Sequence, residues 1–184
     1  MGPLSTGRSL FSPASLASST SALTIALRYI TFRRQFSSNP TEGENLLIDY
    51  PLTKHRMMVP LAETFVYYFG CFSISKLYSD YSKELSNPGN PTVTELHAIS
   101  AVVKPISGMF ALDTITKCRE MLGGHGYSSY SRLKNIYHDH DPANTGEGDN
   151  MLLVQQTSKV LLKLIPKGKP WKLVDFDFIN SPIP

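Results

Sequence analysis

The sequence predicts an all-α protein built as a four-helix bundle. Apolar residues recur at helical spacing in four segments, which proline and glycine separate from one another. The alternation typical of β-strands does not occur over any useful length, and no internal repeat is present. Hydrophobic residues make up 41% of the 184 residues and charged residues only 18%, so the chain can fill a core.

The length corresponds to one domain or to a piece of a larger protein. We expect a helical bundle domain over residues 1–165. Residues 166–184 carry four prolines and no helical periodicity, and we expect a tail or a truncated linker there.

The first helix is predicted to begin near Pro13, because proline suits a first helical turn, and to end near Phe36. A loop is expected over residues 37–45. The second helix is predicted over residues 51–85, with a bend or break at Pro60. Its buried stripe is predicted to consist of Met58, Leu61, Phe65, Phe69 and Phe72.

The third helix is predicted over residues 92–122, with a kink at Pro105. A long irregular stretch is expected over residues 123–146. The fourth helix is predicted over residues 147–165, where Pro166 ends it. The apolar face of the third helix is predicted to consist of Leu96, Ile99, Val103, Ile106 and Phe110.

Composition argues against several classes of function. A net charge of +3, evenly spread, is too small to indicate a nucleic-acid surface. No run of eighteen apolar residues occurs, so no membrane span is expected. Cys71 and Cys118 cannot form a disulfide framework or a zinc site alone, and we expect both to pack in helices. His138 and His140 fit no common ligand spacing, so no metal site is expected.

Residues 1–41 contain four arginines, many serines and threonines, and no acidic residue. That composition is typical of a mitochondrial transit peptide. The alternative is a bundle helix whose polar face is cationic.

Two segments are candidates for chemistry. The first is the turn from Gly123 to Gly126, where glycine allows a ligand to approach the backbone around His125. The same glycines could instead cap the preceding helix. The second is Glu147, since glycine on both sides exposes its carboxylate, as suits a base that reaches a bound substrate. A capping role for Asn144 or Thr145 would explain this segment without any such function.

The segment from Cys118 to Lys163 resembles the C-terminal helical domain of peroxisomal acyl-CoA oxidases, with the nearest likeness to the branched-chain, pristanoyl-type enzymes. Two motifs carry the resemblance: CRE followed by GGHGY, and an EGDN box at residues 147–150. The segment ALRYITFRRQF, residues 26–36, resembles the first helix of the same domain. The likeness therefore favours a bundle helix over a transit peptide. A second box of this kind, EGEN at residues 42–45, lacks a preceding GGHGY, and we assign it no catalytic role.

The resemblance implies a flavin-dependent oxidase, which converts an acyl-CoA and dioxygen to a trans-2-enoyl-CoA and hydrogen peroxide in peroxisomal fatty-acid β-oxidation. By its position in the motif, Glu147 resembles the base that removes the α proton. The resemblance implies FAD as the cofactor and a homodimer in which these contacts reach the FAD of the neighbouring subunit. The residues implied in FAD binding are Arg33, Gln35, Phe36, Glu120, Gly123, Gly124, His125, Gly126, Asp149 and Asn150.

The sequence departs from the family pattern in two ways. Gly146 stands where the family typically has an aromatic residue before the base. The N-terminal helical domain, the middle β-domain and a second C-terminal helical domain of the family have no counterpart in these residues. The resemblance implies a peroxisomal location, with the mitochondrion as the alternative, although the last residues are not an SKL-type address. The alternative function is a non-catalytic helical bundle, truncated or degenerate, that binds no flavin. The enzymatic interpretation requires the Glu147 side chain to lie near the His125 turn and not to turn outward into open water.

Overall fold

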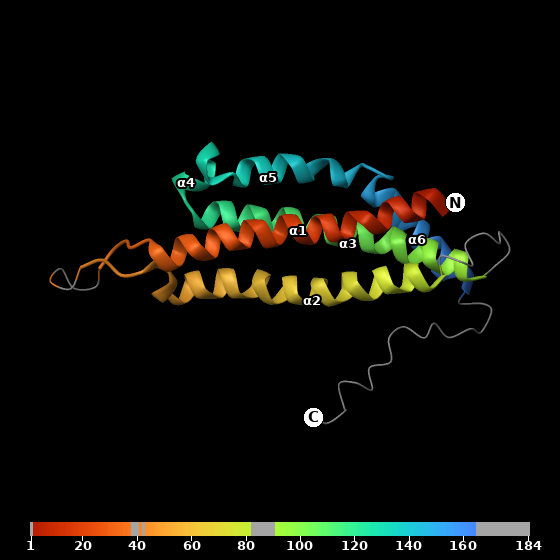
Figure 1. The fold of residues 1–184 in the computed structure, drawn as a ribbon, viewed down its shortest axis with the longest axis horizontal. Coiled ribbons are helices and arrows are strands. Elements are labelled where there is room, and N and C mark those ends of the chain that lie inside the picture. Colours follow the sequence, from red (N-terminus) through yellow and green to blue (C-terminus); the bar gives the residue numbers. More distant parts are fainter. Residues whose placement is uncertain (1, 38–40, 42, 82–90, 165–184) are drawn as a thin grey trace, which may run out of the picture.

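The computed structural model describes residues 2–37, 41, 43–81 and 91–164 (Figure 1). Three helices of 31 residues each dominate it: α1 (Gly2–Phe32), α2 (Pro51–Tyr81) and α3 (Pro91–Met121). A shorter helix, α6 (Asn150–Leu164), packs on α3. Within these ranges the chain forms no strand, and its extended pairing is a single bridge between Arg34 and Leu46. The all-α prediction is therefore confirmed.

Helix α1 packs along α3 and also contacts α2, as Figure 1 shows. The face of α1 against α3 consists of small residues: Ser12, Ser15, Ser19, Ala22 and Ala26 are all buried. Their spacing of three and four places them on one side of the helix, and small side chains let the two backbones approach closely. The hydroxyls of Ser12 and Ser107 are 3.0 Å apart across this contact.

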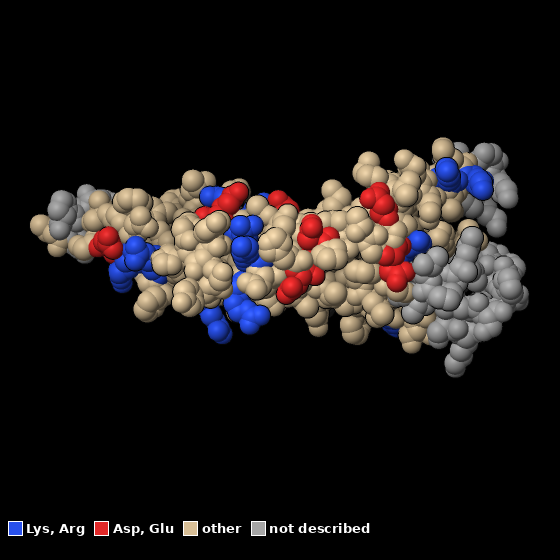
Figure 2. Space-filling model, turned by 90° about the horizontal axis from the view of Figure 1, so that it is seen from above, with Lys and Arg blue, Asp and Glu red and all other residues tan. Residues whose placement is uncertain are grey.

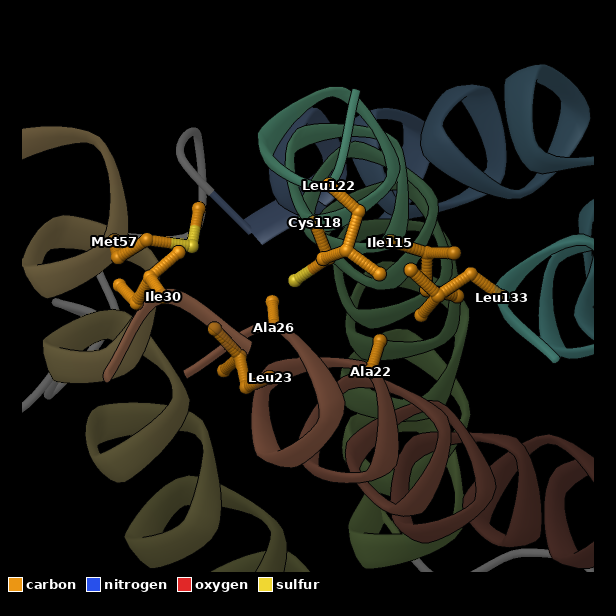
Figure 3. Packing of buried hydrophobic residues seen from close by; sticks show 9 residues of the cluster. All are labelled: Ala22, Leu23, Ala26, Ile30, Met57, Ile115, Cys118, Leu122 and Leu133. Carbon is orange, nitrogen blue, oxygen red and sulfur yellow. The ribbon is translucent and has the colours of Figure 1, made fainter. Parts of the chain in front are cut away.

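An apolar core cluster lies where α1, α2, α3 and α5 (Leu133–His140) meet. Figure 3 shows Met57 of α2 beside Ile30 of α1, and Leu133 of α5 beside Ile115 of α3. Cys118 is part of this cluster, and burial raises the pKa of its thiol to about 12. Cys71 is also buried, so the prediction that both cysteines pack in helices is confirmed.

The boundaries of the first helix differ from the prediction. Helix α1 already includes Gly2, and Pro13 lies inside it at an exposed position, where one missing N–H is tolerated. The helix ends at Phe32 rather than Phe36. Residues 33–36 instead form a hairpin-like pair with residues 45–47, in which Gln35 N donates to Asn45 O at 2.9 Å.

The predicted buried stripe of the second helix is wrong by one position. Phe69 and Phe72 are 67% and 68% exposed, and Met58 and Phe65 are exposed as well. The buried side chains of α2 are instead Met57, Pro60, Thr64, Cys71 and Tyr78. Because α2 carries apolar residues around most of its circumference, periodicity could not identify the face that contacts the other helices. The predicted break at Pro60 is also absent, since α2 continues through it.

The buried face of α3 is likewise richer in small and polar residues than predicted. Leu96 is buried as expected, but Ile106 is 48% exposed. The remaining buried positions include Ala101, Lys104, Ser107, Ala111, Thr114 and Ile115. The close approach of α1 selects small residues here, whereas a search for large apolar side chains passes over them.

The stretch predicted as irregular is mostly helical. It contains α4 (Gly124–Tyr127), α5 and two short 3-10 helices, η2 (Ser129–Ser131) and η3 (Asp141–Asn144). Another 3-10 helix, η1 (Leu47–Asp49), precedes α2. The fourth predicted helix begins at Asn150 rather than at residue 147. The predicted tail over residues 166–184 lies outside the described residues.

Three helices, Gly7–Phe32, Pro51–Asp80 and Thr94–Met121, are long and apolar enough to cross a membrane by length and composition. The argument from an unbroken apolar run therefore does not exclude a span, because leucine, isoleucine, valine, phenylalanine and alanine keep the average hydropathy high although polar residues interrupt each run. The same helices form the bundle.

On the face seen in Figure 2, acidic and basic side chains lie among one another.

Gly126 allows α4 to fold back over the end of α3. A Cβ there would overlap the carbonyl oxygen of Arg119 and lie 2.7 Å from its carbonyl carbon. We expect Gly126→Ala to lower the free energy of unfolding by about 3 kcal/mol, because backbone atoms would have to move. Gly124→Ala is the matched control, since nothing lies within 4 Å of its Cβ position. Urea denaturation of the two variants measures the difference, and equal stabilities would contradict this account.

His140 lies at the end of α5 and is buried, whereas His138 is exposed. Both residues lie on α5, within the stretch that was expected to be irregular, and the described residues contain no cluster of three metal-ligating side chains. Burial lowers the pKa of His140 from its ordinary value of 6.5, while a backbone hydrogen bond with Gly108 opposes the shift. Within the described part of the chain, Nε2 of His140 has no hydrogen-bond partner.

Because burial lowers the pKa of His140, its ring takes up a proton less readily in the folded protein than in the unfolded chain. The contribution of the neutral ring to the free energy of unfolding is therefore complete above about pH 6.5 and is lost as the pH falls below it. We expect His140→Gln to weaken the fall in stability as the pH is lowered. Burial also lowers the pKa of His97, so part of the dependence remains. Urea midpoints measured between about pH 7.5 and pH 5 test this. His138→Gln should keep the wild-type slope, because its side chain is exposed.

Candidate active site

The residues implied in cofactor binding fall into two groups at opposite ends of the bundle. One group lies where α1 and α3 end, around the turn that contains His125. The other lies beside the N-terminal part of α1, around Glu147. Figure 1 shows α4 at one end of the long helices and the N-terminus at the other.

At the first end, the His125 ring contacts Tyr29 of α1, with the ring centroids 5.7 Å apart. Gly123 has a φ of 56°, a conformation that glycine adopts easily, and its N–H donates to Glu120 O at 3.0 Å. The glycines thus end α3 and pack α4 against it. Gly124 and His125 remain exposed, so this turn both caps a helix and offers an open backbone surface.

Arg33, Gln35 and Phe36 follow α1 at the same end. Phe36 has a φ of 61° and its ring is exposed, while the carbonyl of Gln35 accepts a hydrogen bond of 2.8 Å from the Tyr50 hydroxyl. The guanidinium of Arg33 is exposed and makes no hydrogen bond or ion pair with the described residues. The carboxylate of Glu120 is 2.6 Å from Arg56, so it is held in place. Together with the open turn, these residues form a polar surface with one uncommitted cation.

At the second end, Glu147 occupies the turn between η3 and α6. Its φ is 56° and its side chain is exposed. The carboxylate lies over Gly7 of α1, where a Cβ would come within 2.7 Å of the Glu147 Cδ. Its backbone carbonyl accepts a hydrogen bond of 2.9 Å from Nε of Arg8. Glycine at position 7 therefore leaves the space in which the carboxylate sits.

The small residue before Glu147 has a neighbour that fills the adjacent space. A Cβ at Gly146 would lie 3.0 Å from Cζ of Phe11 and 3.1 Å from the carbonyl oxygen of Pro142. An aromatic ring from α1 is therefore present beside this turn, although the turn itself carries none. A larger side chain at position 146 would displace that ring.

Asp149 and Asn150 have contacts within the chain. Oδ1 of Asp149 accepts hydrogen bonds from the N–H groups of Met151 at 2.9 Å and Leu152 at 3.3 Å, so it caps α6. The capping expectation for Asn144 or Thr145 is therefore wrong. Asn150 is buried, and its amide donates to Oδ1 of Asn144 at 3.1 Å.

Lys104 is a site residue that the sequence patterns did not indicate. It lies on α3, is only 1% exposed, and donates to Asn150 Oδ1 at 2.8 Å. Burial lowers its pKa, while the carboxylates of Asp149 and Glu147 act in the opposite direction. A lysine within a stretch otherwise made of apolar and small residues was the available signal.

The two groups are far apart within one chain. Gly7, beneath Glu147, and Tyr29, against His125, are 22 positions apart on α1. At about 1.5 Å per residue, the separation is about 33 Å. The expectation that Glu147 lies close to the His125 turn is therefore wrong for a single chain, because most of the length of α1 lies between them. The expectation that its side chain does not face water is also wrong for a single chain, since the side chain is exposed.

A family model described as the acyl-CoA oxidase C-alpha1 domain matches residues 2–162. Peroxisomal acyl-coenzyme A oxidase 3 of Homo sapiens is 36% identical over 193 residues, which cover 96% of this chain and 27% of the human protein. Acyl-coenzyme A oxidase 2, peroxisomal, of Arabidopsis thaliana is 35% identical over 163 residues, which cover 89% of this chain and 23% of the plant protein. These identities differ too little to select one branch of the family.

Solved structures give the same result. An acyl-CoA oxidase from tomato, Lycopersicon esculentum, matches with a TM-score of 0.85 and 32% identity, covering 95% of this chain and 27% of that one. Acyl-CoA oxidase-1 of Caenorhabditis elegans, complexed with FAD and ATP, matches with a TM-score of 0.85 and 27% identity, covering 97% and 28%. The chain thus spans about a quarter of the length of these relatives. With its helices, motifs and matches in agreement, the chain belongs to the acyl-CoA oxidase family, as a C-terminal helical domain of the C-alpha1 type.

Proposed function

We propose that this chain provides the proton-accepting domain of a peroxisomal acyl-CoA oxidase. The observation that carries the proposal is the placement of Glu147. Its carboxylate is exposed, lies over a glycine of another helix, and belongs to a turn whose backbone that helix holds. A base that must reach a bound thioester needs both this exposure and this support.

In the proposed reaction Glu147 takes the proton from the α carbon of an acyl-CoA. The chemistry that FAD would supply when bound is acceptance of the hydride from the β carbon and transfer of the two electrons to dioxygen, which would yield hydrogen peroxide. The acyl chain loses one proton and one hydride and becomes a trans-2-enoyl thioester. The substrate we propose is a long or methyl-branched acyl-CoA.

The residues at the other end fit the polar half of a dinucleotide. Arg33 provides an uncommitted guanidinium, which suits a pyrophosphate, and the open backbone at Gly124 and His125 allows close approach. Gln35, Phe36 and Glu120 border the same surface, and Gly123 and Gly126 shape the turn. We assign Asp149 and Asn150 the task of shaping the turn of Glu147, because their contacts lie within the chain.

The separation of about 33 Å along α1 supports a shared site. One copy of the chain cannot place both groups against a compact flavin site. In a homodimer, one site would combine two subunits. The residues around His125 of one subunit would contact FAD, and Glu147 of the other subunit would contact the acyl-CoA bound beside that FAD. We therefore propose that the FAD-bound form is a homodimer.

Glu147→Gln should abolish proton removal while preserving the fold, because the amide has the same shape but no basic oxygen. We expect peroxide formation from a long-chain acyl-CoA, in the presence of FAD, to fall by about 10²- to 10⁴-fold. Exchange of the substrate α protons with D2O, followed by NMR without dioxygen, should fall in parallel. Glu42→Gln, in the second box of the same wording, is the matched control and should leave both rates unchanged. Normal peroxide output from Glu147→Gln would exclude this base.

Arg33→Ala should weaken FAD binding by about tenfold or more, because one charge-assisted contact to phosphate is lost. A monomer holds only half of the proposed shared site and should bind FAD weakly. Equilibrium dialysis is the suitable measurement, because it detects weak binding. Arg28→Ala, also exposed but on α1, is the control and should bind FAD like the wild type. Failure of the wild-type chain to bind flavin or produce peroxide under any of these conditions would instead favour a non-catalytic helical bundle.

A further inference from the structure

The backbone at Glu147 is strained. Glu147 and Gly148 have φ values of 56° and 115°, both in the region that favours glycine. A glutamate keeps such a conformation only where the surrounding structure holds it. Within the turn, the N–H of Gly148 donates to Thr145 O at 3.2 Å, and the remaining contacts come from other helices.

Two buried cations supply those contacts. Arg8 of α1 is 5% exposed, and its Nε donates to the carbonyl of Glu147 at 2.9 Å. Lys104 of α3 donates to the next carbonyl, that of Gly148, at 2.7 Å. Adjacent carbonyls are therefore bound by two different helices, which fixes the two peptide groups on either side of Gly148, the first of which directly follows Glu147.

Lys104 makes two further contacts. Its ammonium donates to Asn144 O at 3.2 Å and to Asn150 Oδ1 at 2.8 Å, so its three N–H groups all have partners at the two ends of the turn. The ammonium also lies 5.7 Å from the centre of the Phe11 ring. In the described part of the chain neither Lys104 nor Arg8 forms a salt bridge with a carboxylate. Arg8 also contacts Nδ1 of His97 at 3.4 Å through its Nη1. Burying two cations against partners that carry no negative charge is costly, and a purely structural turn could be held by uncharged donors.

We propose that Arg8 and Lys104 are positioning residues that hold Glu147 in its left-handed conformation and so direct its carboxylate over Gly7 towards the substrate. The inference rests on the proposed function insofar as Glu147 is the base. The hold on the turn itself does not depend on that assignment, so the two can be tested separately.

Lys104→Met is the first variant, because it removes the charge and keeps an unbranched side chain of similar length. We expect hydrogen exchange of the amides in residues 144–150, followed by mass spectrometry, to become at least tenfold faster, with the α1 and α3 core peptides little changed. Lys117→Met is the matched control on the same helix. Lys117 is partly exposed and paired with Asp113, so its loss should leave residues 144–150 unchanged.

The double variant Lys104→Met/Asn150→Leu separates positioning from stability. It replaces both members of a buried polar pair by apolar groups, so the unfolding temperature should recover in part towards that of the wild type, while the carbonyls of Asn144 and Gly148 still lack their donor. The turn still lacks its link to α3, so its exchange should stay fast. In the FAD-supplemented assay, kcat should remain about 10- to 100-fold low, with KM within about twofold of wild type. Recovery of exchange and kcat together with stability would overturn the proposal.

If Lys104→Met does not fold, Arg8→Lys tests the same proposal. This variant keeps the positive charge but changes the geometry of the hydrogen bond to the Glu147 carbonyl. Faster exchange confined to residues 144–150 supports the proposal, and unchanged exchange overturns it. A Glu147→Gln variant with normal α-proton removal would reject the proposed base. It would leave the exchange results for Lys104 and Arg8 intact.

Discussion

The close contact between α1 and α3 determines where the two groups of candidate site residues lie, one around His125 and the other around Glu147. Its face on α1 is a row of serines and alanines, and the buried hydroxyls of Ser15 and Ser19 donate to carbonyls one turn earlier at 2.8 and 2.9 Å. Small residues let two long backbones run side by side without bulky side chains between them. This contact places Gly7 and Arg8 beneath the turn of Glu147, and it brings Tyr29 to His125 at the other end.

The sequence allowed the helical class, the family and the two groups of candidate residues to be predicted. Local spacing and short motifs carry that information, because glycine, proline and the EGDN box act within a few residues. The faces of the helices were less accessible. On α2, apolar residues lie on several sides, and the stripe at Phe65, Phe69 and Phe72 is exposed, whereas Thr64 and Cys71 are buried. Which side is buried depends on the neighbouring helices, and periodicity within one helix does not contain that information.

The candidate site shows the same limit. The flanking glycines allowed Glu147 to be predicted as a candidate from the sequence. Lys104 and Arg8 could not be predicted, since their hydrogen bonds to the turn span 44 and 139 positions of sequence. No local pattern links a lysine in one helix to a carbonyl in a distant turn. The separation of the two ends was also inaccessible, because motif order along the chain gives no direction in space. It follows only from the length and straightness of α1.

The serine and alanine face of α1 also limits how this helix can vary. Between Gly7 and Tyr29 the helix makes roughly six full turns, so both ends face nearly the same side. Inserting or deleting a single amino acid between them would rotate one end by about 100° relative to the other. Either Gly7, which lies beneath the Glu147 carboxylate, or Tyr29, which contacts the His125 ring, would then turn away from α3. Length changes are therefore tolerable in the connecting loops, whereas this segment must keep its register as well as its small buried residues.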